Sequence, residues 1–215
     1  MDILLTAVDF FLHLDKYLGS AITAYGNLTY GLLFLIIFCE TGLVVTPILP
    51  GDSLIFAAGA LSAGSVLSPI MLFILLAAAA IMGDSVNYSI GRFFGVKILE
   101  GKTGLIKEKH LRKSQAFYDK HGGKTIIIAR FVPIVRTFAP FLAGLSHMNY
   151  SRFIAYNFIG GIAWVGLFVF GGYYFGNLPV VRENFSFVIF AIIFVSLLPP
   201  AIDFLRHKWF NKESI

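Results

Sequence analysis

The sequence predicts an all-α integral membrane protein, and three observations support that fold class. Hydrophobic residues make up 57% of the chain and charged residues 13%, with a mean hydropathy of +0.79, which is outside the usual range of soluble proteins. Two apolar segments, 28–61 and 124–145, are each interrupted by prolines and charged residues. A long apolar stretch follows each of them. We therefore expect a single membrane domain, 1–215, with an internal repeat.

The first repeat, about residues 10–96, begins with an amphipathic segment and continues into a broken one. Positions 3–24 mix apolar and charged residues in a pattern typical of a helix lying in the membrane interface. Segment 28–61 is interrupted between Pro47 and Asp52, and each remaining arm is too short to cross roughly 30 Å of hydrocarbon as a helix. This pattern predicts a re-entrant helical hairpin, with a transmembrane helix at 66–95.

The second repeat, about residues 105–178, has the same order of elements. A basic amphipathic stretch, 107–120, precedes the broken segment 124–145, which is interrupted at Pro133, Arg136 and Pro140. A transmembrane helix at 150–176 and a final span at about 185–205 follow. Local matches support the repeat: Tyr25-Gly26 with His121-Gly122, Thr46-Pro47-Ile48-Leu49 with Val132-Pro133-Ile134-Val135, Ala58-Gly59-Ala60-Leu61 with Ala143-Gly144-Leu145, and Gly91-Arg92-Phe93-Phe94-Gly95 with Gly172-Tyr173-Tyr174-Phe175-Gly176.

The charge of the linker predicts the orientation. Each hairpin returns to its own side and each repeat crosses once, so the repeats are inverted relative to each other, as in many secondary transporters. Linker 97–124 holds eight Lys or Arg against three acids, which places it in the cytoplasm. The final span brings Arg206, Lys208 and Lys212 to the same side, so the C-terminus is predicted to be cytoplasmic. The Gly-x-x-x-Gly pairs at 91–95 and 172–176 fit either a homo-oligomer interface or internal packing.

Two arginines within the second broken segment are the most costly residues of the chain. A central intramembrane Arg costs roughly 2.5–3.5 kcal/mol, and such a charge marks a functional site by default. Arg130 and Arg136 stand in an otherwise apolar sequence, and the candidate counter-charges are Glu40 and Asp52, which lie in an equally apolar setting. Irregular backbone at membrane depth is tolerated only where protein or a wet cavity surrounds it. We therefore expect the two hairpin breaks to meet at a buried anion site.

Two interpretations of these four residues remain open. Buried salt bridges could simply hold the hairpins together. Alternatively, two guanidiniums can bind a phosphate bidentately, while Glu40 and Asp52 exchange protons beside them. Position favours a functional role, because Asp52 follows Pro50-Gly51, where it can cap a half-helix, and helix N-termini attract anions.

Polar stripes on the two predicted spans are expected to face this site as supporting residues. They occur at helical spacing in 66–95 and again in 150–176. Their glycines are more readily explained by tight helix packing. The stripes comprise Asp84, Asn87, Tyr88 and Gly91, and then Asn157, Gly160, Gly161 and Trp164.

Several classes of function have little support in the sequence. The five histidines lack the spacing of a metal site, and the single cysteine, Cys39, excludes an internal disulfide, so neither a metal nor a cofactor is expected. No hydrolase motif is present, so we do not expect an enzyme. The net charge of +5 is explained by the membrane flanks and by attraction to membrane lipids, without nucleic acid.

The broken segments and the first span together resemble the DedA family over nearly the whole chain. The resemblance implies a bacterial inner-membrane protein with two opposed re-entrant hairpins, related to the VTT-domain lipid scramblases of eukaryotes and linked in bacteria to recycling undecaprenyl phosphate. It also implies that the family's important acids and arginines correspond to Glu40, Asp52, Arg130 and Arg136. The motifs that carry it are Glu40-Thr41-Gly42, Pro47-Ile48-Leu49-Pro50-Gly51-Asp52, Gly83-Asp84-Ser85-Val86-Asn87-Tyr88, the runs 130–133 and 136–140, and Ala143-Gly144-Leu145.

The hypothesis that follows is a flippase for a polyprenyl phosphate, coupled to protons or monovalent cations. Arg130 and Arg136 would bind the substrate phosphate, and Glu40 and Asp52 would carry the coupling. One alternative is a proton-coupled ion antiporter, in which the acids form the ion path. Another is a structural or assembly factor that maintains the cell envelope.

Overall fold

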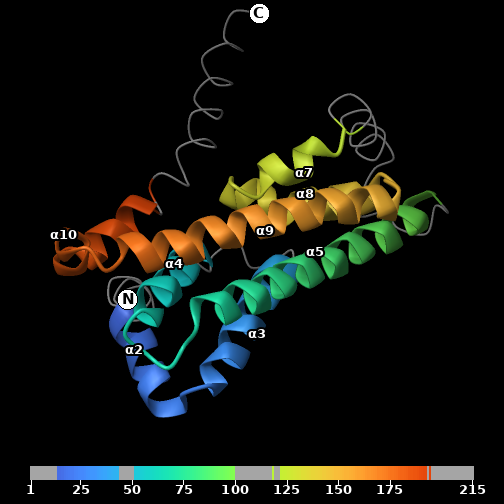
Figure 1. The fold of residues 1–215 in the computed structure, drawn as a ribbon. Helices are drawn as coiled ribbons and strands as arrows, with labels where there is room; N and C mark the ends of the chain where they lie inside the picture. The colour runs from blue at the N-terminus through green and yellow to red at the C-terminus, as the bar shows by residue number, and fades with distance from the viewer. Residues whose placement is uncertain (1–13, 44–50, 100–117, 119–121, 193, 195–215) are drawn as a thin grey trace, which may run out of the picture.

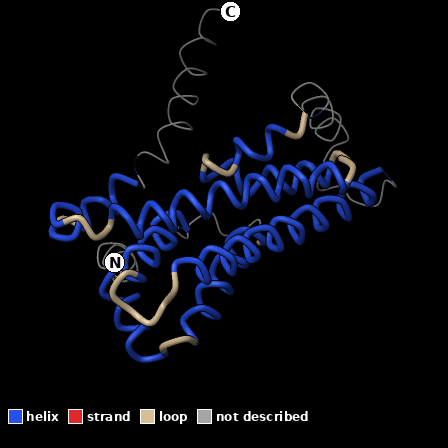
Figure 2. The backbone as a smooth tube through the Cα atoms, viewed as in Figure 1, coloured by secondary structure: helices blue, strands red, loops and turns tan. Residues whose placement is uncertain are grey.

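The chain folds into a bundle of helices, and each half contains two hairpin arms followed by a long helix. In the computed structural model, the described residues are 14–43, 51–99, 118, 122–192 and 194, and all their regular elements are helices (Figures 1 and 2). The first half contains α2 (Leu14–Tyr25), α3 (Leu28–Gly42), α4 (Gly51–Ser62) and α5 (Pro69–Leu99). The second half contains α7 (Lys124–Ala129), α8 (Pro133–Leu145), α9 (Tyr150–Phe175) and α10 (Pro179–Glu183).

These bounds confirm most predicted elements and place one break differently. The second hairpin is interrupted at 130–132, and Pro133 begins α8, because proline is tolerated in the first helical turn. Arg136 and Pro140 therefore lie inside α8 and do not interrupt the hairpin as predicted. Residues 185–192 are helical at the start of the predicted final span. Segments 3–13, 44–50, 193 and 195–205, and the linker stretch 107–120 apart from Tyr118, lie outside the described residues.

The same glycine turn introduces the hairpin of each half. Gly26 and Gly122 have φ angles of +52° and +68°, a conformation that glycine adopts without steric penalty. The N–H of Gly26 donates to the Ile22 carbonyl and that of Gly122 to the Tyr118 carbonyl, both at 2.8 Å. The Gly26 turn follows α2, and each of the two turns leads into the first arm of a hairpin. This agreement in backbone geometry supports the repeat that the sequence matches predict.

The halves are joined by crosswise packing, because the second arm of each hairpin lies against the long helix of the other half. Helix α4 packs on α9, and α8 packs on α5. At both crossings the backbones touch through glycine: a Cβ at Gly172 would overlap the Phe56 carbonyl, and one at Gly144 would overlap the Tyr88 carbonyl. Gly59 and Gly91 make the reciprocal contacts from α4 and α5. Internal packing therefore accounts for Gly91 and Gly172.

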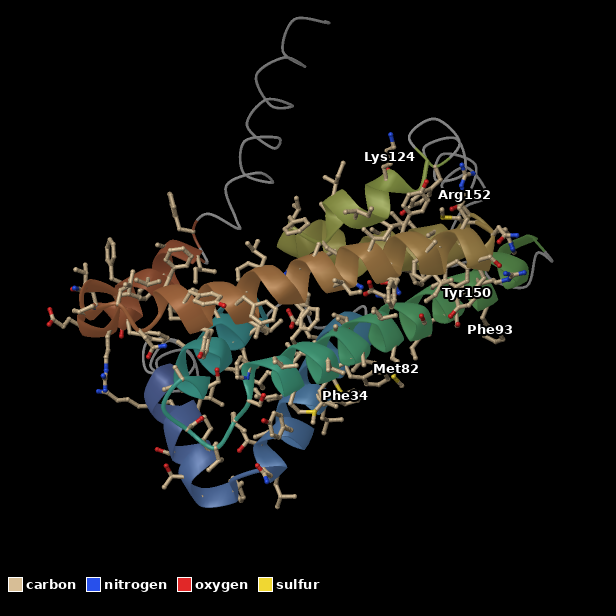
Figure 3. All side chains as sticks on the ribbon, in the orientation of Figure 1. Phe34, Met82, Phe93, Lys124, Tyr150 and Arg152 are labelled. Carbon is tan, nitrogen blue, oxygen red and sulfur yellow. The ribbon has the colours of Figure 1, made fainter. Side chains whose placement is uncertain are left out.

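The two long helices have the dimensions of membrane spans. Within them, Pro69–Phe94 and Tyr150–Phe175 are 26 residues each with hydropathies of 2.0 and 1.9, enough for the 20 or so residues that a crossing needs. They run antiparallel and side by side (Figure 1). Only 39% of the most apolar window of each is buried inside the protein. Large apolar side chains project outward from α5, for example Met82 and Phe93 (Figure 3). These features are those of helices in contact with lipid.

The glycine crossings can be tested with a matched pair of substitutions. Gly144→Ala places a methyl group into the backbone of α5 and should lower the free energy of unfolding by about 1–3 kcal/mol, the usual cost of overpacking. Gly171→Ala, also within a helix, meets nothing within 4 Å and should be neutral or slightly stabilising. Thermal unfolding of the purified variants in detergent measures both, and equal melting temperatures would contradict the crosswise contact.

Candidate functional site

A cluster of five buried charged residues lies where the hairpins meet the long helices. One part of it is centred on Arg136, in the first turns of α8. Its Nη2 donates to Glu40 Oε1, and its Nη1 donates to Asp52 Oδ1 at 2.5 Å. The residues are 8%, 1% and 7% exposed, so both ion pairs are shielded from solvent. One guanidinium therefore bridges two carboxylates from different arms of the first hairpin.

The start of α4 explains why Glu40 can reach this position. Glu40 lies in the last turn of α3, and its Oε1 accepts a hydrogen bond of 3.3 Å from the backbone N–H of Gly51 at the first position of α4. A carboxylate there is favoured by the positive end of the helix dipole. A Cβ at Gly51 would overlap the Glu40 carboxylate, so the close approach requires glycine. The second carboxylate oxygen, Oε2, is buried and has no hydrogen-bond partner within the described part of the chain.

The second part of the cluster is centred on Arg130, at the break between α7 and α8. Its Nη2 donates to Asp84 Oδ2 of α5 at 2.5 Å and to Asn157 Oδ1 of α9. Arg130 and Asp84 are only 4% and 3% exposed. The counter-charge of Arg130 is therefore Asp84, whereas the sequence pattern suggested Glu40 and Asp52 as candidates for both arginines. Asp84 comes from a long helix, so this pair joins the second hairpin to the span of the first half.

Helix α9 supplies the surface on which both guanidiniums lie. Trp164 is 1% exposed, and its ring centroid is 5.0 Å from Cζ of Arg136 and 5.9 Å from Cζ of Arg130, within the range of cation–π contacts. Its Nε1 donates to Asp52 Oδ1 at 2.9 Å. Gly160 lies one turn earlier, where an added Cβ would come within 3.0 Å of the Arg130 side chain. The stripe from Asn157 to Trp164 thus faces the cluster along its whole length.

The charges are divided between the halves and do not cancel. All three carboxylates come from the first half, on α3, α4 and α5, and both guanidiniums from the second. When all five groups are ionised, the cluster carries one net negative charge. Asp84 and Trp164 lie close to the middle of the spans Pro69–Phe94 and Tyr150–Phe175, so the cluster lies near the mid-length of the two long helices.

The other predicted supporting residues have two different locations. Asn87 is fully buried, and its Nδ2 donates to the carbonyl oxygens of Thr41 and Thr137, at 3.1 and 2.8 Å, next to Glu40 and Arg136 in the chain. Tyr88 faces elsewhere: its hydroxyl donates to the Met148 carbonyl. Its ring packs on Tyr150 and Phe153 at the start of α9. Asn87 therefore braces the cluster, while Tyr88 fixes the turn between α8 and α9.

Several buried polar atoms in and beside the cluster are not satisfied by its ion pairs and hydrogen bonds. Within the described part of the chain, Nε of Arg130 and Nε of Arg136 have no hydrogen-bond partner, nor do Oδ1 of Asn87 and Oγ of Ser53. Buried polar groups are normally satisfied, so each of these has capacity for a further partner. No group of three metal-ligating side chains is found among the described residues.

Comparisons with known proteins identify the family. The VTT domain model matches residues 45–174, which include both hairpins' second arms and all of the cluster except Glu40. The chain is 53% identical to Protein DedA of Escherichia coli strain K12 over 211 residues, covering 97% of this chain and 96% of that protein. It belongs to the DedA family.

More distant relatives of the DedA family support a membrane location. The inner membrane protein YghB of E. coli strain K12 is 32% identical over 82% of this chain and 80% of its own. An uncharacterized membrane protein of Mycobacterium tuberculosis strain H37Rv is 41% identical over 85% of this chain and 81% of its own. No solved structure matches the chain. Together with the two long apolar helices, these names establish that this DedA family member is a membrane protein.

Sequence reasoning placed Asp84 and Trp164 on the polar stripes expected to face the site. It did not identify Asp84 as the partner of Arg130, nor the contacts of Trp164 with Asp52 and the two arginines. What the spacing could not show is which long helix lies next to which arginine. That depends on the crosswise packing of the halves.

The Arg130–Asp84 pair can be tested by a double-mutant cycle. Asp84→Asn leaves a buried guanidinium without its carboxylate and should lower the free energy of unfolding by about 3–5 kcal/mol, whereas Glu183→Gln, at an exposed carboxylate of α10, should have little effect. Adding Arg130→Met to Asp84→Asn should recover part of the loss, because no charge is then left unpaired. Thermal unfolding in detergent measures the cycle, and additive losses would show that the pair is not formed.

Proposed function

We propose that this protein moves the headgroup of a phosphate lipid between the leaflets, as a flippase for a polyprenyl phosphate, with undecaprenyl phosphate as the preferred candidate. The observation that supports it most is the sharing of Arg136 by Glu40 and Asp52. A guanidinium with two carboxylate partners can release a carboxylate and donate two parallel hydrogen bonds to a phosphate in its place. The isoprenoid tail stays in lipid, and no covalent chemistry is needed.

The charge of the cluster supports a coupling to protons. With one net negative charge, the fully ionised cluster repels a phosphate. Protonation of Glu40 and Asp52 would change the net charge to one positive and free Arg136 from both partners. Phosphate binding and proton uptake are then linked, because each favours the other. An inward proton gradient would bias the headgroup toward the cytoplasmic leaflet.

The proposed setting is the inner membrane of a bacterium, with the C-terminus in the cytoplasm. One E. coli relative is named an inner membrane protein. The excess of Lys and Arg in linker 97–124 and at the C-terminus favours the cytoplasmic side for both.

An ion antiporter is the second candidate, and two observations favour it. Glu40 Oε2 is buried without a partner in the described residues, and the cluster has one more carboxylate than guanidinium. Both features suit a proton or a monovalent cation. An antiporter would move ions through liposomes that contain no phosphate lipid, whereas the flippase requires the lipid.

Arginine variants test the transport of phosphate lipid. Purified protein in liposomes should remove undecaprenyl phosphate from the leaflet where a headgroup probe can reach it. Arg130→Ala and Arg136→Ala should slow this about ten- to a hundredfold, because a hydrogen bond to a charged group contributes about 1.5–3 kcal/mol. Arg152→Ala, at an exposed arginine of α9, is the matched control and should transport normally. Equal rates for all folded variants would refute arginine-mediated transport.

Acid variants test the coupling. Glu40→Gln and Asp52→Asn remove the two proton acceptors beside Arg136, so each should abolish or flatten the dependence of lipid transport on an imposed pH gradient. Glu183→Gln, at an exposed site, should leave that dependence unchanged. Headgroup accessibility is followed at a series of inside and outside pH values. A gradient response that both acid variants retain would eliminate proton coupling at these residues.

A further inference from the structure

Asp52 Oδ1 accepts two hydrogen bonds, and the two donors belong to different helices. Arg136 Nη1 of α8 donates at 2.5 Å and Trp164 Nε1 of α9 at 2.9 Å. In the proposed transport cycle, Arg136 has to leave this oxygen in order to bind the lipid phosphate. The indole N–H belongs to a fully buried ring whose helix is fixed by the glycine contacts of the α4–α9 crossing. It therefore stays in place when Arg136 turns.

The ring of the same tryptophan also contacts both arginines. The indole centroid is 5.0 Å from Arg136 Cζ and 5.9 Å from Arg130 Cζ. Cation–π attraction at these distances holds a guanidinium beside the ring while leaving its N–H edges free for other partners. An arginine that exchanges a carboxylate for a phosphate can do so without losing this support.

We propose that Trp164 is a positioning residue that holds Asp52 and both guanidiniums in place while Arg136 exchanges its carboxylate partners for the anionic headgroup. This inference rests on the proposed function for the identity of the headgroup. The hydrogen bond from Trp164 to Asp52, on which the exchange depends, is independent of any lipid.

Charged groups from every neighbouring element surround the Asp52 carboxylate. Arg136 of α8 is in direct contact, and Glu40 of α3 shares that arginine. Across the indole lie Arg130, at the break before α8, and its partner Asp84 of α5. Trp164→Phe removes one of these donors to Asp52 Oδ1 and keeps an aromatic ring beside both arginines.

The indole itself provides a test that needs no lipid substrate. The chain has two tryptophans, so Trp209→Phe leaves Trp164 as the single indole, whose N–H resonance can be followed by ¹H–¹⁵N NMR of the protein in nanodiscs. We expect Asp52→Asn to displace this resonance, because it replaces the carboxylate that accepts from the indole N–H. Leu167→Ala, at an exposed side chain of α9, is the control and should leave the resonance in place. An indole resonance that is unchanged in Asp52→Asn overturns the proposal.

Transport measurements complete the test and separate the two hypotheses. Trp164→Phe retains the ring and removes the donor, so we expect about tenfold slower headgroup transport at neutral pH, the usual effect of losing one hydrogen bond to a charged group. In a protein that already carries Asp52→Asn, Trp164→Phe should cause little further loss, because the hydrogen bond is already altered. Leu167→Ala, at an exposed side chain of α9, should leave the rate unchanged. Equal losses from Trp164→Phe with and without Asp52→Asn would show a role that does not act through Asp52 and overturn the proposal. An indole resonance that depends on Asp52 in a protein that moves no phosphate lipid would contradict the flippase alone.

Discussion

The burial of two guanidiniums in a membrane is the constraint on which the rest of the structure depends. Arg130 and Arg136 are nearly inaccessible, and each requires a carboxylate at contact distance. No single helix can supply both, so the breaks in the hairpins and the long helices must converge on one place. The short hairpin arms end where the charges lie, and the glycines allow the helices to approach closely. The polar stripes of the long helices supply the remaining partners.

The two arginines have different surroundings, although they lie six positions apart. Arg130 has one carboxylate and an amide as partners and forms an electrically balanced pair. Arg136 is shared between two carboxylates, so its surroundings carry the excess negative charge. An electrically balanced pair is suited to holding helices together. An arginine with two carboxylate partners is suited to exchanging one of them for another anion. The difference arises from position, because Arg130 faces α5 and α9, while Arg136 faces the end of α3 and the start of α4.

Local features of the fold could be predicted from the sequence, whereas the pairing of charges could not. Proline positions, the length of the apolar segments and the repeated Gly-containing motifs were sufficient to predict helices α3, α4, α5, α8 and α9. Helix formation depends on residues that are neighbours in the chain. Arg136 and Pro140 were wrongly predicted as interruptions, because both lie inside the helix that begins at Pro133. The Arg130–Asp84 pair spans 46 positions and depends on how α8 crosses α5. Periodicity places Asp84 on a polar face but does not reveal which arginine lies opposite.

The separation of acids and bases between the halves has a consequence for biogenesis. All three carboxylates are synthesised before either arginine, since Asp84 precedes Arg130 by 46 residues. The first half thus enters the bilayer with its acids unmatched, and they gain their partners only when the second hairpin is made. Until then, protonation or residence near the insertion machinery has to stabilise them. Neither half alone satisfies its own charges, so the two are obliged to assemble as one unit even though each has the outline of a complete repeat.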